Sequence, residues 1–436
     1  MRALGRVVRA AVGPALVAGV VVGLTVPALA VPTDATLDAD PPRVVYGATT
    51  RLFGQVTGAA AGDPVEIRDA ATNDLLDDTT TDATGSYEIP AFAPERTVEV
   101  KAVAGAVESP PVTIRVKPAV KARIGRVFLF GKTKVTGRVD PSPSGETATL
   151  RLLRGTKIVA SRSVPVRSDG SVGTRFKVSK LGRYRGQIVY KPAGLVQGAD
   201  KSRARRPRTP KLSDGAQGKA VRLLERRLRL LHYYLVGINR KFDERTGDAV
   251  LAFHKVQGMT RTKTVTKSTW RRLTHPRRPG PRSRRPRFHI EIDQTKQVLY
   301  VIRKGSITEI VHTSTGRSGA TRDGVFRVHR KVAGYSPNRL YYPSYFDGNR
   351  AVHGWPDVPP YPASHGCSRV PYWTAIHLHD IMPIGTVVRV TPRRLAVTFT
   401  PDPALRERFD DPAEVYQRVC RDFPNGLEMA AESTWP

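Results

Sequence analysis

Cys367 is one of only two cysteines in this chain of 436 residues, and two histidines, His353 and His365, lie close to it in sequence. A free thiol has a pKa of about 8.5, so only a few per cent of it is thiolate at neutral pH. A nucleophilic cysteine therefore needs an imidazole close by to accept its proton. The three residues together predict cysteine-based nucleophilic chemistry.

The two histidines are not equally placed to act as the base. His365 precedes Cys367 by two residues, and side chains at i and i+2 point the same way only in an extended backbone, so contact between them requires a bent turn. His353 lies fourteen residues upstream and can face the thiol from an adjacent strand. Gly366 permits a tight turn, and the N–H groups around Gly366 and Cys367 could bind the oxyanion of a tetrahedral intermediate.

Strands must position these residues. Apolar runs predict strands at 289–292, 297–302 and 307–311, joined as hairpins through the Gly305 turn, and a closing strand at 386–390. Four short motifs lie between the third strand and the last. They are Ser314-Thr315-Gly316, Thr321 to Phe326, His353-Gly354, and Ser364-His365-Gly366-Cys367-Ser368-Arg369.

These motifs resemble the catalytic domain of L,D-transpeptidases of the YkuD type, exported cysteine acyltransferases that cross-link peptidoglycan. The family pattern is an H-G pair and then S/T-H-G-C-x-R, preceded by S-T-G and T-P-x-G-x-F. The resemblance covers residues 288–390 and implies a mostly β catalytic domain. The catalytic set that it implies is Cys367 as nucleophile, His353 as general base and acid, Gly354 as the carbonyl acceptor that fixes the imidazole tautomer, and His365 in the turn.

The resemblance also implies a substrate groove. Its members are expected to be Ser364, Gly366 and Arg369 in the cysteine loop, with Tyr342 and Phe346 on a mobile flap above it. The aromatic stretch 335–346 and Trp355 would complete the cleft.

Three departures from the family pattern concern the shape of the site and not its reacting groups. Arg322 stands where the family has proline, Ser368 replaces an aliphatic residue, and ten residues separate His353 from Ser364.

By resemblance, Cys367 attacks the carbonyl of the third residue of a tetrapeptide stem, and His353 protonates the departing D-Ala amine. An amine of a neighbouring stem, or a protein amine, then attacks the thioester; attack by water would make the enzyme an L,D-carboxypeptidase. Neither outcome requires a metal or organic cofactor. A non-catalytic wall-binding protein remains an alternative. A zinc site that combines Cys367 with His377 or His379 lacks a recognisable ligand spacing.

Residues 212–274 change to helical periodicity. An apolar face is formed by Val221, Leu224, Leu228 and Leu231, and a second helix is expected to start at 246–247. The segment resembles the three-helix peptidoglycan-binding domain of cell-wall hydrolases. Glu225, His254 and the run 261–263 depart from that pattern, and a helical bundle used only for packing is the alternative.

Two β-sandwiches are expected upstream, at 41–116 and 117–195. Residues 47–56 match 131–139 at an offset of about 84 residues, and 82–87 match 169–172. Short alternating runs between turn signals are typical of immunoglobulin-like modules, which these resemble. We expect them to serve as spacers or wall contacts.

The net charge is +33 at pH 7. Residues 31–116 carry 6 basic and 14 acidic side chains, so the basic excess lies downstream. It is concentrated in two Pro-rich segments, 196–211 and 275–287, that we expect to be extended linkers. Their charge predicts weak attraction to anionic wall polymers, whereas a fold that reads nucleic acid is missing, and no obligate protein partner is indicated.

The N-terminal and C-terminal segments of the chain have their own predicted roles. Residues 1–30 combine early arginines, an apolar run and an Ala28-Leu29-Ala30 exit, which predicts a secretory signal peptide, with an uncleaved anchor as the alternative. The protein is therefore expected to be extracytoplasmic and wall-associated. In the tail 393–436, Cys420 is expected to be a buried helix residue. The fold class is a multidomain chain of two β-sandwiches, a small three-helix bundle and a mostly β catalytic domain.

Overall fold

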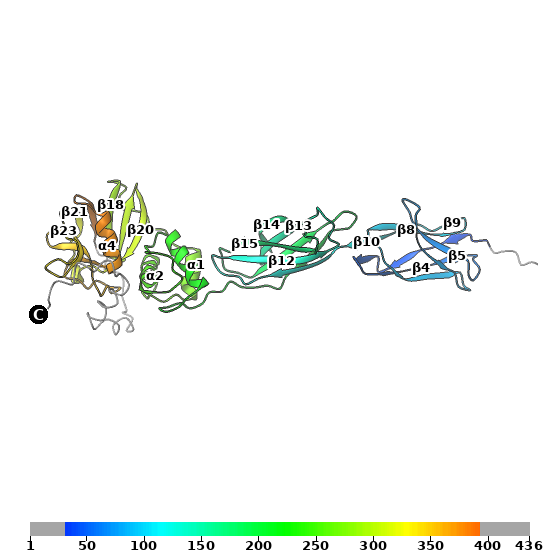
Figure 1. Cartoon of the computed structure of the whole chain (residues 1–436), viewed down its shortest axis with the longest axis horizontal. Coiled ribbons are helices and arrows are strands. Elements are labelled where there is room, and N and C mark those ends of the chain that lie inside the picture. Colours follow the sequence, from blue (N-terminus) through cyan, green and yellow to red (C-terminus); the bar gives the residue numbers. More distant parts are fainter. Residues whose placement is uncertain (1–30, 393–436) are drawn as a thin grey trace, which may run out of the picture. The chain divides into compact units, whose positions relative to one another are not determined.

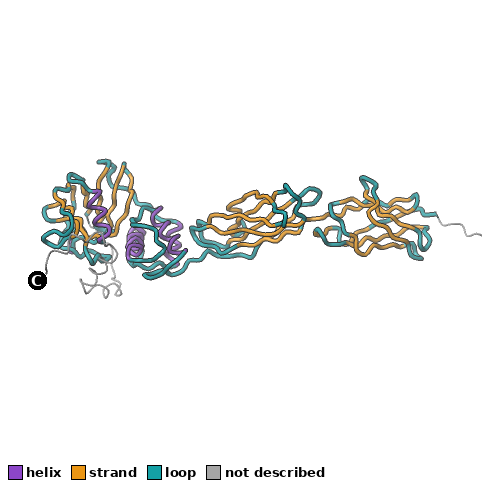
Figure 2. Tube along the Cα trace, viewed as in Figure 1, coloured by secondary structure: helices purple, strands orange, loops and turns teal. Residues whose placement is uncertain are grey.

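The computed structural model describes residues 31–392, so the predicted signal peptide 1–30 and the tail with Cys420 lie outside the described residues. Within that range the chain is multidomain and mostly β, with four α-helices, which confirms the predicted class at this level (Figures 1 and 2). It divides into two compact units: 31–119 with Lys191–Gln197, and Val120–Tyr190 with 198–392. None of the helices between residues 31 and 392 has the length and apolar character needed to cross a bilayer.

The first unit contains two sheets around one core. Four strands form the sheet β1-β4-β2, in which β7 also pairs with β4, and six form β3-β10-β8-β5-β6, in which β9 pairs with β8. Leu52 of one sheet and Ile67 of the other are fully buried in the shared core. The strands are β1 (Asp34–Ala35), β2 (Asp38–Asp40), β3 (Arg43–Val45), β4 (Thr50–Thr57), β5 (Pro64–Asp69), β6 (Leu75–Thr80), β7 (Ser86–Phe92), β8 (Val98–Ala104), β9 (Val107–Glu108) and β10 (Val112–Lys117).

The second unit begins with another pair of sheets, β11-β12-β15 and β14-β13-β16-β17. Their inner faces meet in a core that includes Val135, Leu150 and Ile188. The strands are β11 (Ala119–Ile124), β12 (Lys132–Asp140), β13 (Thr147–Arg154), β14 (Lys157–Pro165), β15 (Ser171–Lys177), β16 (Tyr184–Tyr190) and β17 (Gly198–Lys201).

The two β regions repeat one local design. β4 pairs with β7 in the first and β12 with β15 in the second, and the matched sequence segments lie in or next to these strands. Gly85 and Gly170 both adopt positive φ, +78° and +73°, and their carbonyls accept the N–H of Val56 and Val139. Because a side chain at either glycine would run into the backbone of that valine, the repeated Gly has a steric cause.

The first basic segment, expected to be a linker over 196–211, is held in place by backbone pairing. Its start forms β17 against β16, Arg205 exchanges two backbone hydrogen bonds with Tyr184, and the Arg208 N–H donates to Val127. The second β region therefore extends beyond the predicted boundary at residue 195, and the first begins at Asp34, before the predicted boundary at residue 41.

Three helices follow, α1 (Lys219–Leu230), α2 (Glu244–Gln257) and α3 (Lys267–Thr274). The predicted face of α1 is confirmed, because Val221, Leu224, Leu228 and Leu231 are all buried in one core. α2 begins earlier than predicted, since the Asp243 carboxylate caps the helix by accepting the Thr246 N–H.

Two sheets form the remainder. The five-stranded sheet has the order β20-β19-β18-β26-β21 and the four-stranded sheet the order β22-β23-β24-β25. The elements are β18 (Phe288–Asp293), β19 (Val298–Arg303), β20 (Ser306–His312), η1 (Arg317–Gly319), β21 (Gly324–Arg327), β22 (Arg330–Lys331), β23 (Tyr341–Asp347), β24 (Arg350–Gly354), β25 (Ser368–Val370), α4 (Tyr372–Ile381) and β26 (Val387–Thr391). The four predicted strands correspond to β18, β19, β20 and β26.

The helical segment packs directly on the five-stranded sheet. Val298, Ile302 and Ile310 of β19 and β20 belong to the same buried core as the three helices. The backbone also joins them, because the Ile310 N–H donates to His232 O at 2.7 Å and the Tyr234 N–H to Ile310 O at 3.0 Å.

Candidate active site

Cys367 and His353 come from two neighbouring segments of the four-stranded sheet region. β24 and β25 are parallel, with Val352 opposite Ser368 and His353 opposite Arg369. Side chains of paired residues point to the same face and alternate along a strand. Cys367 lies directly before β25 and two residues before Arg369, so the chain brings it to the start of the strand that pairs with the His353 strand.

The thiol is half-buried and lightly held. The Ala351 N–H donates to Cys367 Sγ at 3.4 Å, and the thiol lies 3.8 Å from Asn349 O, a weak donor contact. Burial raises the pKa of Cys367 against the smaller opposing effects of the Ala351 N–H and two arginines. The resting thiol is thus protonated at neutral pH.

The imidazole of His353 is buried and its tautomer is defined. Nδ1 lies 2.9 Å from Gly354 O, and because a carbonyl only accepts, Nδ1 carries the hydrogen and Nε2 carries the lone pair. Burial lowers the pKa of His353 to about 4, with a smaller contribution from the positive charge of Arg369. Trp355 meets the ring edge to face at 5.6 Å, and the Arg369 guanidinium lies 5.0 Å from the Trp355 ring.

The loop before Cys367 is fixed by its own side chains. Ser364 Oγ donates to Cys367 O at 2.6 Å and accepts the Gly366 N–H at 3.1 Å. Gly366 has φ +142°, and a Cβ there would approach Arg350 Nε to 2.9 Å. Since the Gly366 N–H is already engaged, it is not free to bind an oxyanion, which leaves the Cys367 N–H as the other predicted donor.

The motifs upstream support this loop. The Gly316 N–H donates to Thr321 Oγ at 2.7 Å, and Thr321 Oγ donates to Gly366 O at 2.8 Å. Ser314 and Arg369 exchange two backbone hydrogen bonds of 3.0 and 2.9 Å. The S-T-G and T-x-x-G motifs therefore buttress the cysteine loop.

Arg322, where the family has proline, belongs to an ion-pair network that the sequence did not reveal. It pairs with Asp347, which Arg350 also contacts at 3.0 Å, and Arg350 Nε donates to Ala320 O at 2.9 Å. The hydrogen bond from Arg322 is the main cause of the lowered pKa of Asp347. Because Arg322 and Asp347 are 25 positions apart, no local pattern in the sequence marks the pair.

Three of the predicted site residues, His365, Phe346 and Tyr342, have surroundings that the sequence did not indicate. His365 is exposed, and its Nε2 lies 3.1 Å from Arg317 Nη2. Phe346 is only 3% exposed in the hydrophobic core, where it packs on Phe326, so its assignment to a mobile flap is corrected. Tyr342 is on β23, with its ring centroid 5.1 Å from that of His379.

Sequence reasoning also missed a buried lysine beneath the site. Lys255 of α2 is 3% exposed, and its Nζ donates to Thr313 O and Gln297 O, each at 2.9 Å, and lies 2.7 Å from His312 Nδ1. Thr313 directly precedes the S-T-G motif. Arg261, a departure from the peptidoglycan-binding pattern, donates to Pro360 O and Thr295 O, so both side chains tie the helices to the catalytic domain.

Comparison with known proteins gives a family. Residues 287–390 match the model described as the L,D-transpeptidase catalytic domain, and residues 217–273 the model of a putative peptidoglycan binding domain. The crystal structure of an L,D-transpeptidase from Xylanimonas cellulosilytica is 32% identical, over 42% of this chain and 99% of that one, with a TM-score of 0.41. The chain belongs to the L,D-transpeptidase family.

This L,D-transpeptidase chain is also similar, at 22% identity over 43% of its length and 97% of the other, to an L,D-transpeptidase from Stackebrandtia nassauensis, with a TM-score of 0.28. An L,D-transpeptidase from Mycobacterium tuberculosis matches at 18% identity over 24% of this chain and 58% of that one, with a TM-score of 0.23. No curated protein matches the chain. Because these TM-scores are below 0.5, the family rests on the domain model and the 32% identity.

Proposed function

We propose that the protein is an exported L,D-transpeptidase that acts on peptidoglycan stem peptides through a Cys367 thioester. One observation carries the proposal. Cys367 lies at the start of the strand paired with the His353 strand, and the Gly354 carbonyl holds the hydrogen of His353 on Nδ1, which leaves Nε2 as the ring nitrogen able to accept a proton.

The reaction begins from two neutral groups. Cys367 Sγ attacks the carbonyl of the third stem residue while its proton passes to His353 Nε2. The Cys367 N–H is the proposed donor to the oxyanion. The C–N bond then breaks, His353 returns the proton to the amine of the departing D-Ala, and a thioester remains.

The second half-reaction reverses these roles. The amine of a neighbouring stem attacks the thioester, His353 takes a proton from it, and Sγ leaves as the thiol. Water in place of the amine would give an L,D-carboxypeptidase.

Substrate contacts follow from the same loop. Ser364 and Gly366 shape the turn, and the Arg369 guanidinium lies beside Trp355 on the His353 face, where it could pair with a stem carboxylate. Tyr342, on β23, is a further candidate. His365 is proposed to act on the shape of the turn through Arg317 and not as the base.

The remaining parts are proposed to place the enzyme at the wall. Residues 1–30 would direct export, the two β regions would be immunoglobulin-like spacers, and 212–274 would be a three-helix bundle that binds peptidoglycan. This proposal includes the predicted domain divisions, with the first β region starting at β1 and the second ending after β17. It also includes the wall-associated location.

A product analysis tests the function. The purified protein is incubated with a disaccharide-tetrapeptide, and products and intact protein are followed by mass spectrometry. We expect free D-Ala, a cross-linked dimer and a protein adduct of the disaccharide-tripeptide acyl mass, none of which should form with C367A. Tripeptide without dimer would identify the carboxypeptidase, and no D-Ala release by wild type would refute both.

A further inference from the structure

The second basic segment was expected to be a free linker over 275–287, but buried side chains fix its backbone. Gln257, 2% exposed, accepts the Arg277 N–H at 2.7 Å and donates to Arg277 O at 2.9 Å. Glu291, also 2% exposed, accepts the N–H groups of Arg282 and Ser283 at 2.9 and 2.8 Å. The arginines of this segment are therefore displayed from a rigid support.

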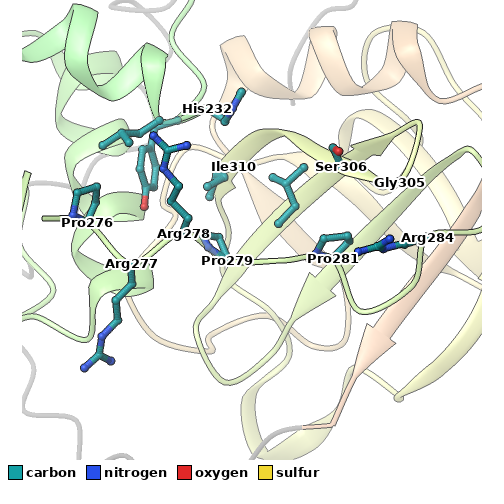
Figure 3. A pocket seen from close by; sticks show the side chains of 13 residues that line it. His232, Pro276, Arg277, Arg278, Pro279, Pro281, Arg284, Gly305, Ser306 and Ile310 are labelled. Atoms are coloured by element: carbon teal, nitrogen blue, oxygen red, sulfur yellow. The ribbon is translucent and has the colours of Figure 1, made fainter.

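This support forms one wall of a cavity of about 300 Å³ between the helical segment and the β19–β20 hairpin. Figure 3 shows Arg278 and Arg284 at opposite ends of the hollow, with Arg277 pointing away from it. Prolines and apolar side chains form much of the lining. The lining residues are Leu231, His232, Tyr233, Pro276, Arg277, Arg278, Pro279, Pro281, Arg284, Gly305, Ser306, Ile307 and Ile310.

The cavity carries unbalanced positive charge. Its lining includes three arginines and no carboxylate, and within residues 31–392 none of the three forms an ion pair. All three are exposed. The positive charge of Arg278 also adds to burial in lowering the pKa of Arg227.

We propose that this cavity is a binding site for the phosphodiester groups of an anionic wall polymer. Guanidinium groups match phosphate oxygens in bidentate geometry, and a fixed backbone reduces the entropy lost when they bind. The prolines and the Ile307–Ile310 wall suit the carbon chain between successive phosphates. None of the lining residues belongs to the Cys367 site, so this would be a second wall contact, separate from acyl transfer.

The test compares two variants that lose equal charge. R277Q/R278Q/R284Q removes Arg278 and Arg284, at the two ends of the cavity, together with their neighbour Arg277, and R203Q/R205Q/R206Q removes three exposed arginines of the first basic segment. Binding of labelled poly(glycerol phosphate) is measured by fluorescence anisotropy between 50 and 200 mM NaCl. If Arg278 and Arg284 each contact one phosphate, wild-type affinity should fall about 7-fold over this range, by analogy with counterion release from single-stranded nucleic acid.

We expect the cavity variant to lose this binding and its salt dependence, and the control variant to remain close to wild type. R278E, a single change at an exposed position, should weaken binding in the same direction and guards against misfolding of the triple variant. Equal losses in both triple variants would overturn the proposal in favour of overall charge. Equal or tighter binding of wild type to phosphatidylglycerol vesicles or a DNA oligonucleotide would overturn it in favour of another polyanion.

D-Ala release from a soluble tetrapeptide, measured in parallel, keeps this inference independent of the proposed function. The cavity variant should retain it. Loss of polymer binding with intact D-Ala release supports the separate site, and absence of D-Ala release from wild type would count against the transpeptidase and leave the binding comparison valid.

Discussion

The second unit contains two pairs of titratable groups whose pKa values are shifted by burial, and they differ in what their polar atoms contact. In the Lys255–His312 pair, Nζ faces two carbonyls and His312 Nδ1, and His312 Nε2 donates to Val358 O at 2.7 Å. In the Cys367–His353 pair, only Nδ1 of the imidazole is engaged, and no partner of Nε2 occurs within residues 31–392.

The hydrogen bonds of the Lys255–His312 pair determine how many hydrogens its nitrogen atoms carry. Three carbonyls each need a donor, and one further hydrogen joins Lys255 Nζ to His312 Nδ1, so the pair holds four hydrogens where its neutral forms supply three. It therefore carries one shared positive charge, although burial lowers the pKa values of both groups. Every N–H group and lone pair of the two side chains has a hydrogen-bond partner, so the pair has no proton to pass to a substrate.

The comparison shows that a shifted pKa does not by itself identify a reacting group. Burial lowers the pKa of His353 and that of His312 alike. What separates them is Nε2 of His353, which has no hydrogen-bond partner within residues 31–392, whereas both ring nitrogens of His312 are engaged. A perturbed pKa selects candidates, and the hydrogen-bond count decides between a structural pair and a catalytic one.

Replacement of Cys367 by alanine should have the largest effect on turnover. Without the sulfur no thioester can form, and D-Ala release should fall by at least about 10⁴-fold, as when other catalytic nucleophiles are removed. Because the thiol makes only weak contacts, the unfolding midpoint in urea should stay near that of wild type. Residual turnover near the wild-type rate would place the nucleophile elsewhere.

His353→Gln should come next, with His365→Gln as its matched control. Loss of a general base typically costs about 10²- to 10⁴-fold in kcat. His365 is exposed and contacts Arg317, so its replacement should change kcat far less. Steady-state rates of D-Ala release measure both, and a larger loss in the His365 variant would reverse the assignment of the base.

Short sequence patterns were sufficient to predict several elements of the candidate active site. The motif Ser364–Arg369 and the strands at 289–292 and 307–311 have signatures within a few residues, and the structure places the corresponding elements there. The repeat at Gly85 and Gly170 was visible for the same reason, since both glycines meet a local steric requirement.

Pairings distant in sequence were not predictable. Lys255 and His312 are separated by 57 positions, and Gln257 and Glu291 fix a segment that composition alone marks as a linker. A buried lysine in an amphipathic helix resembles a surface lysine until its tertiary partner is known. The same limitation hid the Arg322–Asp347 pair, because charge pairing across a fold carries no periodic signal.

Lys255→Met should destabilise the fold without abolishing chemistry. It leaves two carbonyls and His312 Nδ1 unpaired in the interior, which should cost about 3 kcal/mol in the free energy of unfolding. Lys296→Met is the matched control, because Lys296 is 40% exposed in its pair with Asp293, and such pairs contribute about 1 kcal/mol or less.

Urea unfolding of both lysine variants gives the stability change, and D-Ala release per folded molecule gives the chemistry. A small stability loss combined with a turnover loss as large as that of His353→Gln would show that Lys255 acts in the reaction, which would break the comparison between the two pairs.

The pH dependence should show the smallest effect, because His353 stays neutral over an unusually wide range. With a pKa of about 4, some 90% of the imidazole is neutral at pH 5, against about 3% for an ordinary imidazole of pKa about 6.5. We therefore expect kcat/KM to stay nearly level from pH 7 to pH 5 and to fall near pH 4. A fall centred near pH 6.5 would contradict the buried, neutral base.

Stability should respond over a different window from activity. The pKa of His353 is lower in the folded state than in the unfolded chain, so the unfolded state binds more protons below pH 6.5. The stabilisation is complete above pH 6.5 and is lost as the pH falls towards 4, by up to about 1.4 kcal/mol per pH unit for each such histidine. Burial also lowers the pKa of His254 to about 4, so His254 adds to the same dependence of stability on pH. Unfolding curves between pH 7 and pH 4 should therefore shift while kcat/KM of the folded enzyme remains level, because the neutral imidazole that supports stability is the same species that accepts the thiol proton.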